Sequence, residues 1–489
     1  MMMKLKNNWI LTLLIVPLLA GTLTFSGCRH GGYDESVKLV FSTDTLMFDT
    51  LFTTVSSITR SFTVYNPSPD PVKLDIYLAG GDQSYYSINV DGVAGKEFHD
   101  VEIPAKDSIF VFVKVTINPT NQNNPYLVTD SVLFYNTQRR QSVQLVAFGQ
   151  DAHFIVPDHI GSSMSYNIVA HEHEDVHWTN DKPWVIYGWA VVDSLGKLTI
   201  DPGTKVYIHH GGGIWVYRYG NIHVNGTYDD PVLFAGDRLE PFYATDYEQW
   251  NRILINEGTH DNIINNAIIT NSATGVEVSS LMEYLGNKTI INNTVIHNNK
   301  YYGLVAQGAD VEMNNCQISN TGSYSVVLQV GDFSLNHVTI ADFFSQSARK
   351  EPALAVSCYY DKGNVRYLGN TNLVCNNSII YGNYSDDECE DEFVAATHSG
   401  ADLNYHFNNC LIKKETLDNH FTNCIHLKDP QFVSNYSQNY NLKESSPAID
   451  AGMTGLGITT DILGRLRNGN PDIGAYEYYP AAEEKRIRR

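Results

Sequence analysis

The sequence lacks several features that define common classes of protein. After residue 20 it has no apolar run approaching the roughly 20 residues that a membrane-spanning helix needs. Its seven cysteines include no CxxC pair, so a zinc site built from thiolates is not expected. Basic residues number 33 against 54 acidic ones, and this excess of negative charge argues against nucleic acid or anionic lipid as a partner.

The second half of the sequence instead contains a recurring phrase: an apolar residue, an Asn directly after it, and an Ile four positions after the Asn. The phrase occurs six times, at intervals of 27, 22, 22, 40 and 32 residues, and internal periods of this size indicate a solenoid. The six residues are Asn265, Asn292, Asn314, Asn336, Asn376 and Asn408.

Each repeat has the pattern of a strand that begins after a bend. A small or medium-sized residue lies midway between the Asn and its Ile, which is the alternation of a strand with one buried face. The apolar residue before the Asn is out of phase with this alternation. The chain must therefore bend at the Asn, a residue that tolerates the left-handed backbone such bends use.

These coils predict an all-β fold, a right-handed parallel β-helix over residues 155–428. A 22-residue coil holds about three strands and three bends. A helical solenoid is the competing interpretation, but the coils are rich in Asn, Thr, Ile and Val and lack the apolar spacing of helices. In the β-helix, Ile296, Ile318 and Ile340 should form one vertical stack.

Residues 1–28 predict where the protein is located. Lys4 and Lys6 precede an apolar run from Trp9 to Ala20, which is too short to span a bilayer and is typical of a signal peptide. The run ends at Phe25-Ser26-Gly27-Cys28, which resembles the lipobox of bacterial lipoproteins. The resemblance implies that Cys28 is diacylated and becomes the mature N-terminus. An ordinary secreted protein cleaved nearby is the alternative.

The residues after the lipobox refine this location. Arg29 follows the cysteine, without the Asp that retains lipoproteins in the inner membrane, so the resemblance implies the outer membrane. Asp34 and Glu35, in a tether of residues 29–37, fit the acidic stretch that some Gram-negative bacteria use for surface export. Loss of residues 1–27 removes two basic residues and leaves 31 − 54 = −23 on the mature chain.

Residues 38–150 have the pattern of a β-sandwich. Strand-like runs alternate with turn sequences such as Asn66-Pro67-Ser68-Pro69-Asp70. About seven short strands in this length predict an antiparallel sandwich with an immunoglobulin-like layout. Its expected role is that of a spacer that lifts the solenoid off the membrane and closes its first coil.

Residues 429–480 carry the strongest family resemblance. They include Ser446-Pro447-Ala448-Ile449-Asp450-Ala451-Gly452 and Asp472-Ile473-Gly474-Ala475-Tyr476-Glu477-Tyr478. With the Asn coils and the lipobox, this tail resembles right-handed parallel β-helix proteins of the choice-of-anchor type found on bacterial surfaces. The resemblance implies a C-terminal coil and cap whose charged residues pair with one another, and no particular activity. Residues 481–489 are expected to form a solvated basic tail.

Carbohydrate is the expected partner. Parallel β-helices resemble polysaccharide lyases and hydrolases, whose long sheet faces accept linear glycans, but the motifs of those enzymes are missing: Asp229-Asp230 follows Tyr228, and neither Gly-His-Gly nor Arg-Ile-Lys occurs. We therefore favour a non-catalytic glycan-binding or adhesive lipoprotein on the outer membrane, facing the cell exterior. A polysaccharide lyase or glycoside hydrolase acting on a linear polysaccharide is the alternative.

The loop from Asp237 to Arg252 is the strongest candidate for a site, because it inserts charged and aromatic residues between two strands. Carboxylates and an Arg can act as acid/base pair and charge stabiliser, and exposed aromatic rings stack on sugars. The catalytic candidates are Asp246, Glu248 and Arg252, and the glycan-binding candidates are Tyr243, Tyr247 and Trp250. A loop packed over the sheet by its own aromatic residues is the alternative.

Two clusters are candidate metal sites. The first alternates along the chain, so that a strand would place all its members on one face, with a hydrated edge strand as the alternative. It comprises His171, His173, Asp175 and His177. The second is the acidic run of residues 386–392, a candidate Ca²⁺ site that lacks the spaced ligands of a defined loop; a solvated acidic bulge is the alternative.

Six cysteines remain after the lipobox. An exported location permits disulfides, but Cys316 and Cys410 occupy equivalent inward positions of their coils and Cys375 precedes an Asn. These three are expected to be small buried hydrophobic residues. Cys389 lies in the acidic run and is the candidate for a disulfide with one of two partners, Cys424 or Cys358.

We predict that Cys28→Ser abolishes lipid attachment, because acylation requires the thiol. Metabolic labelling with an alkyne fatty acid in a Gram-negative host should mark the wild-type protein and leave Cys28→Ser unlabelled. Cys424→Ser is the matched control and should be labelled like the wild type. Equal labelling of Cys28→Ser would contradict the lipoprotein interpretation.

Overall fold

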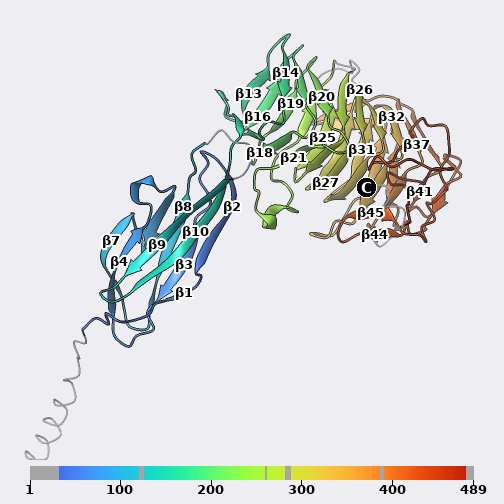
Figure 1. Ribbon diagram of the computed structural model, residues 1–489. Coiled ribbons are helices and arrows are strands. Elements are labelled where there is room, and N and C mark those ends of the chain that lie inside the picture. Colours follow the sequence, from blue (N-terminus) through green and yellow to red (C-terminus); the bar gives the residue numbers. More distant parts are fainter. Residues whose placement is uncertain (1–31, 120–125, 259–260, 281–287, 386–389, 481–489) are drawn as a thin grey trace, which may run out of the picture. The chain divides into compact units, whose positions relative to one another are not determined.

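The structure, a computed structural model, describes residues 32–119, 126–258, 261–280, 288–385 and 390–480. The predicted signal peptide, the lipobox with Cys28 and the basic tail lie outside these residues. The chain divides after Gln150 into two compact units, which are described separately (Figure 1). Among the described residues, no helix has the length and apolar character needed to cross a membrane.

The first unit is a sandwich of two five-stranded sheets. The order in one sheet is β1 (Val40–Phe41), β3 (Arg60–Tyr65), β8 (Ser108–Val115), β5 (Tyr86–Val90) and β6 (Val93–Gly95). The order in the other is β2 (Thr45–Phe52), β10 (Arg140–Gln150), β9 (Tyr126–Tyr135), β4 (Val72–Leu78) and β7 (Glu97–Ile103). Neighbours are antiparallel, except that β2 and β10 run parallel. A short 3-10 helix, η1 (Gly81–Gln83), follows β4.

Alternation along the strands builds the core, which confirms the predicted β-sandwich. The described residues of this unit form ten strands where about seven were predicted. In β8 every second residue is buried, from Ile109 to Val115, while Phe110 and Phe112 face outward. The turn after β3 is fixed by Asn66, whose buried amide donates to the carbonyl oxygen of Ile103 at 3.1 Å. A buried amide satisfied in this way holds the turn in one geometry.

The second unit is a parallel β-helix, as predicted (Figure 1). Most coils contribute one strand to each of three sheets, in the order sheet I, sheet II, sheet III, and the last two coils contribute to sheets I and II. Sheet I contains β14 (Asp175–Trp178), β17 (Lys197–Ile200), β20 (Asn221–Asn225), β23 (Asn262–Asn265), β26 (Lys288–Asn292), β29 (Asp310–Asn314), β32 (Gly331–Asn336), β37 (Thr371–Asn376), β40 (Leu403–Asn408) and β42 (Phe421–Thr422).

The other two sheets are also built from stacked parallel strands, except that the first two strands of sheet III pair antiparallel. Sheet II contains β11 (His153–Ile155), β15 (Trp184–Ile186), β18 (Lys205–Ile208), β21 (Val232–Gly236), β24 (Ala267–Thr270), β27 (Val295–Asn299), β30 (Gln317–Thr321), β33 (Thr339–Asp342), β38 (Ile379–Gly382), β41 (Leu411–Ile412) and β43 (Ile425–His426). Sheet III contains β12 (His159–Ile160), β13 (Ser165–Ala170), β16 (Trp189–Val192), β19 (Gly213–Val216), β22 (Ile253–Ile255), β25 (Thr274–Ser279), β28 (Tyr302–Gln307), β31 (Val326–Gln329), β34 (Leu354–Ser357) and β39 (Phe393–Ala396). Two hairpins lie outside the stack: β35 (Tyr359–Lys362) with β36 (Val365–Leu368), and β44 (Phe432–Ser434) with β45 (Asn439–Leu442).

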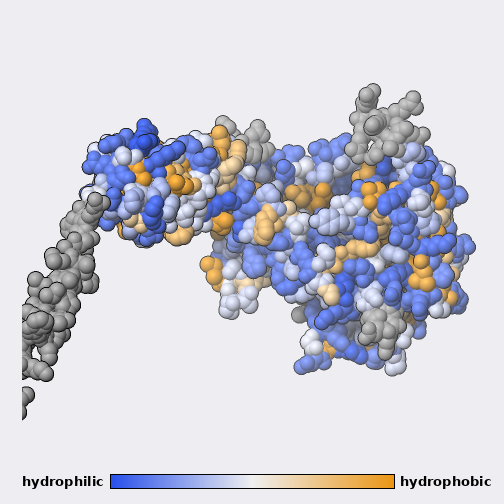
Figure 2. All heavy atoms as spheres, turned by 90° about the horizontal axis from the view of Figure 1, so that it is seen from below, coloured by the Kyte–Doolittle hydropathy of each residue, from blue (hydrophilic) through white to orange (hydrophobic). Residues whose placement is uncertain are grey.

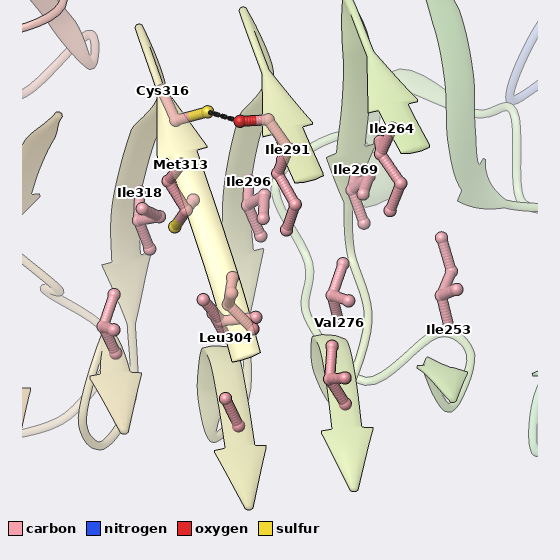
Figure 3. Close-up of a cluster of buried hydrophobic side chains, with 14 of the residues drawn as sticks. Ile253, Ile264, Ile269, Val276, Ile291, Ile296, Leu304, Met313, Cys316 and Ile318 are labelled. Atoms are coloured by element: carbon pink, nitrogen blue, oxygen red, sulfur yellow. Dashed lines mark hydrogen bonds between the residues drawn. The ribbon is translucent and has the colours of Figure 1, made fainter. Parts of the chain in front are cut away.

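Inward side chains of successive coils stack directly on one another. The strand register pairs Ile269 with Ile296, Ile296 with Ile318, and Ile318 with Ile340, and all four are fully buried. Figure 3 shows three of these residues in a row on neighbouring strands, with Leu304 of sheet III among the side chains that share the interior. The predicted vertical stack is confirmed. Burial of apolar area at about 25 cal/mol per Å² makes this interior the main stabilising element of the coils.

The repeated Asn residues form a hydrogen-bonded ladder at the corner between sheets I and II. Each amide nitrogen donates to the amide oxygen of the equivalent Asn one coil earlier: Asn292 to Asn265 at 2.8 Å, then Asn314 to Asn292 and Asn336 to Asn314 at 3.0 Å. The ladder continues through Asn376 and Asn408 at 2.9 Å each.

The bend at this corner lies one residue later than predicted. Left-handed backbone occurs at the residue after each ladder Asn, for example at Asn266 with a φ of 47° and at His337 with a φ of 54°. The ladder Asn itself ends a strand, because its side chain must stay aligned with the coil below. At five of the six corners the left-handed residue is a second Asn: Asn266, Asn293, Asn315, Asn377 and Asn409.

Residues 429–480 fold back along the outer face of sheet II, and we call this segment the strap. It covers apolar outward residues of that sheet, such as Ile379 and Leu411, which would otherwise form an exposed patch. Its hydrogen bonds reach distant coils: Thr460 contacts Tyr228 at 2.9 Å, and the carbonyl of Ala451 accepts from Asn409 at 3.0 Å. The predicted C-terminal coil and cap is thus corrected, because the segment lies beside the stack of coils instead of extending it.

The charged residues of the strap pair with one another, as predicted. Arg465 contacts Asp461 at 2.6 Å, and Arg467 contacts Glu477 at 3.2 Å. The carboxylate of Asp472 accepts hydrogen bonds from backbone N–H groups, and burial raises its pKa to about 6. These interactions fix the fold of the strap.

A buried charge network links sheet II, which the strap covers, to sheet III of the β-helix. The guanidinium of Arg349 contacts both carboxylate oxygens of Glu392, at 2.8 and 3.0 Å, and its Nε lies 3.5 Å from Asp342. The side chain of Arg349 is 1% exposed and both carboxylates are fully buried. Asp342 also accepts from the Ser325 hydroxyl at 2.8 Å, while desolvation raises its pKa.

The cysteines of the coils behave as small core residues. Cys316, Cys375 and Cys410 are fully buried, as predicted, and burial raises the pKa of the Cys316 thiol to about 12. Cys358 and Cys424 form no disulfide with any described cysteine. Cys389, their predicted partner, lies outside the described residues.

We predict that Arg349→Leu lowers the free energy of unfolding by about 3–5 kcal/mol, because two buried carboxylates lose their counter-charge. Urea unfolding followed by circular dichroism measures this change. The control is Arg366→Leu, which breaks a solvent-exposed pair with Asp361 and should leave the unfolding midpoint unchanged. Equal midpoints for the two variants would contradict the structural role of the network.

Candidate functional site

The predicted site loop, residues 237–252, joins β21 of sheet II to β22 of sheet III and contains the 3-10 helix η2 (Pro241–Tyr243). It is fastened by amide side chains. Gln249 donates to the carbonyl oxygens of Tyr243 at 2.6 Å and Asp246 at 3.1 Å, and Asn271 from the next coil donates to Ala244 and Asp246. The loop is therefore a packed corner element.

The aromatic residues of this loop are engaged by the protein itself. Trp250 is 1% exposed, belongs to the core and donates from Nε1 to the carbonyl of Thr270 at 2.8 Å. The prediction that Trp250 is an exposed surface for sugar stacking is wrong. The chain re-enters the coil at this residue, so the indole ring is buried in the core. Arg238 covers the ring of Tyr243 at 4.1 Å, and Tyr247 packs against Phe344 at 5.6 Å. Both tyrosines remain partly exposed.

Two of the three predicted catalytic residues are held in ion pairs. Glu248 forms an ion pair with Lys300, and Arg252 forms an ion pair with Glu277 on the neighbouring strand β25. The Asp246 carbonyl serves the loop as a hydrogen-bond acceptor, as described above. Charges neutralised in this way can orient hydroxyl groups but are poorly suited to exchange protons with a substrate.

The candidate metal sites are not formed by the described residues. Strand β14 starts at Asp175, so His171 and His173 lie in the preceding turn, where His173 has a φ of 65°, and the four side chains do not share one strand face. Across the described ranges no group of three His, Cys, Asp or Glu residues is placed to hold a metal ion.

The candidate Ca²⁺ run is only partly described, since residues 386–389 lie outside the described ranges. Its remaining acidic residues pair with basic ones. Glu390 lies 3.5 Å from Lys413, Asp391 lies 2.5 Å from Lys414, and Glu392 is held by Arg349. The alternative of a solvated acidic bulge is wrong for Glu392, whose side chain is fully buried.

The outer face of sheet III carries aromatic rings on successive coils. Tyr166 and Trp189 are register partners on β13 and β16. Trp215 lies on β19, two residues beyond Gly213, the register partner of Trp189. The Trp189 ring lies over Gly213 of the next coil, where a Cβ atom would come within 2.7 Å of it. Tyr217 adds an edge-to-face contact with Trp215 at 5.4 Å between ring centroids. These four rings are partly exposed.

Polar groups continue the same face toward later coils. The indole Nε1 of Trp215 donates to Asn256 Oδ1 at 2.6 Å, which fixes the ring. The Arg252–Glu277 pair follows, and then a row in which Gln307 donates to Gln329 at 2.8 Å and Gln329 donates to a serine hydroxyl at 2.9 Å. The face therefore combines flat apolar rings with amide groups. Figure 2 shows, on the face it presents, hydrophobic residues in small patches among hydrophilic ones.

A second arrangement lies at the corner between sheets II and III. Tyr187, His209 and Asp237 directly follow the register-aligned ends of β15, β18 and β21. His209 Nδ1 lies 2.7 Å from Asp237 Oδ2, and the Tyr187 ring packs at 4.9 Å from the imidazole. A carboxylate that holds one ring nitrogen leaves the other for proton transfer. Burial and the Asp237 charge raise the pKa of Tyr187.

Comparison with known proteins gives no family. No model of a protein family matches the chain, and no curated protein matches it. Among solved structures, the catalytic unit of the GH87 α-1,3-glucanase from Streptomyces thermodiastaticus strain HF3-3 is 9% identical, with 75% of this chain and 88% of that one covered and a TM-score of 0.22.

Two further solved structures match short parts of the chain. A family 123 glycoside hydrolase from Clostridium perfringens is 8% identical, over 23% of this chain and 26% of that one, with a TM-score of 0.17. The YadV chaperone is 13% identical, over 24% of this chain and 52% of that one, with a TM-score of 0.16. The chain thus spans about a quarter of the hydrolase. Similarities this low assign no activity to the protein.

We predict that Trp250→Ala lowers the free energy of unfolding by about 3–5 kcal/mol, since it removes a buried indole from the core. The control from the same loop is Phe242→Ala, whose side chain is 79% exposed and whose loss should leave the urea midpoint unchanged. A folded Trp250→Ala variant of wild-type stability would place this ring at the surface, against the structure.

Proposed function

We propose that the protein is a surface-anchored outer-membrane lipoprotein whose β-helix binds a linear polysaccharide without cleaving it. The anchor is Cys28, and the sandwich serves as the spacer. The observation that carries the proposal is the outer face of sheet III, where Trp189, Trp215 and Tyr217 present aromatic rings on neighbouring coils beside amide groups. Aromatic rings with one wet edge suit the apolar faces and hydroxyl edges of sugars.

The geometry suits an extended polymer. Coils follow one another at the strand spacing of about 4.8 Å, which is close to the length of one pyranose unit, so a glycan lying along the helix axis meets a new row of side chains at each sugar. The half-buried indole of Trp215 is held in place by Asn256, so little ordering is needed on binding.

The absence of cleavage is supported by the state of the charged side chains. Glu248 and Arg252 are each engaged in an ion pair, and the loop that carries them is fastened by Gln249 and Asn271. The glycosidase mechanism needs two carboxyl groups that face each other across the glycosidic bond. Glu248 instead faces the ammonium group of Lys300.

An enzyme is the second candidate function, favoured by one observation: the His209–Asp237 pair. Such a pair can act as a general base, as in proton abstraction by a polysaccharide lyase. In an assay on acidic and neutral polysaccharides, an enzyme would release unsaturated uronates or new reducing ends. Product that disappears in His209→Asn would favour this candidate and overturn the non-catalytic proposal.

We predict that the double variant Trp189→Ala, Trp215→Ala weakens polysaccharide binding at least about tenfold, because it removes the central rings of the face. Affinity electrophoresis in gels that contain each polysaccharide of the panel measures the change. Tyr436→Ala is the control, since Tyr436 is fully exposed on the strap and should not matter. Unchanged retardation of a folded double variant would remove the proposed binding face.

A further inference from the structure

A cavity of about 440 Å³ lies between the strap and the corner of sheets I and II. Strap residues Gly457–Thr460 form one wall, and the paired Asn residues of three successive coils form the other. The strap is fixed at this point, because the Thr460 carbonyl accepts from Asn315 at 2.6 Å and its hydroxyl contacts Tyr228 at 2.9 Å. The cavity is thus built by two segments that are far apart in the sequence.

The wall of coils offers a regular set of amide groups. Asn265, Asn292 and Asn314 come from the ladder, and the left-handed residues Asn266, Asn293 and Asn315 stand beside them. Some of their hydrogen-bonding capacity is used within the protein: Asn315 donates to Asn293 Oδ1 at 3.2 Å, and Asn266 donates to the carbonyl of Gly226 at 3.0 Å.

Other amide groups remain available to a ligand. Within the described residues, the Nδ2 groups of Asn265 and Asn293 have no protein acceptor, whereas the oxygens of both side chains accept from the next coil. Each amide nitrogen carries two N–H donors, so the ladder leaves donors along the wall at the spacing of the coils. Asn265 and Asn293 both line the cavity.

We propose that this cavity binds a neutral sugar, a mono- or disaccharide unit, at a site separate from the aromatic face of sheet III. The residues that line it carry no charged side chain, so an ionic ligand would lose its hydration without a counter-charge. An apolar ligand would leave the amides unpaired. Hydroxyl groups both donate and accept, and they match a wall of amides.

The remaining lining fits the apolar side of a sugar. Tyr228 is 44% exposed, and its hydroxyl is held by Thr460, so its ring is fixed beside the amide wall. Ile458 of the strap adds an aliphatic surface. A volume of about 440 Å³ is within the range of small-molecule sites, roughly 300–1,000 Å³.

The test is saturation-transfer difference NMR on the mature chain with cellobiose, laminaribiose, maltose and lactose, and with digalacturonate as the charged comparison. We expect at least one neutral disaccharide to bind and digalacturonate to give no signal. Asn293→Gly should weaken binding about fivefold or more, because it removes an amide while glycine keeps the left-handed backbone. Tyr228→Ala, a second variant at a half-exposed residue, should weaken binding about tenfold.

The matched control is Asn423→Gly, which changes a left-handed Asn at the same corner of the last coil, outside the cavity, and should bind like the wild type. The Trp189→Ala, Trp215→Ala variant should keep the disaccharide signal, which separates this site from the proposed polysaccharide-binding face. The proposal is overturned if no neutral disaccharide binds the wild type. It is also overturned if Asn293→Gly and Tyr228→Ala bind as well as the wild type.

Discussion

The β-helix depends on vertical register between successive coils. Parallel pairing sets the coils about 4.8 Å apart, so each side chain meets its equivalent above and below. In the interior this places Ile296 on Ile318, and at the corner it places Asn314 on Asn292. A slip of one residue would turn the isoleucines outward and remove the acceptor of every ladder amide. Apolar burial supplies most of the stability, while the ladder fixes where each coil turns.

The same register organises the outer surface. Residues more than 20 positions apart become neighbours in rows, such as Tyr166 and Trp189 on sheet III or His209 and Asp237 at the next corner. Coils of a solenoid contact only their neighbours, so distant coils are otherwise uncoupled. The strap couples them, because it bonds to both Tyr228 and Asn409, and it also creates the amide-lined cavity.

The sequence period was sufficient to predict the core, since stacking requires similar residues at the same place in each coil, as at Ile269, Ile296 and Ile318. It placed the bend one residue early because two Asn residues follow each other at most corners, and alternation does not say which takes the left-handed backbone. The pairing of His209 with Asp237 could also have been predicted from the sequence. The two residues directly follow the aligned strand ends Ile208 and Gly236.

Other features had no signal in the sequence. Trp250 stands in a charged loop and looks exposed, but its burial depends on Thr270 of the following coil. The partner of Arg252, Glu277, is set by side-chain direction across two strands. The contacts of the strap cross distances such as the 145 residues between Asn315 and Thr460, with no repeat to indicate them. Long-range contacts of this kind follow from the assembled fold and not from local pattern.

Hydroxyl-radical footprinting of the mature chain tests the central claim most directly, namely that coil register assembles a sugar-binding face on sheet III. Mass spectrometry would compare oxidation of aromatic side chains with and without a saturating polysaccharide. The account predicts that Trp189, Trp215 and Tyr217 become protected, while Tyr436, fully exposed on the strap, is oxidised at the same rate. Unchanged oxidation of these three residues while the polysaccharide is bound would contradict it.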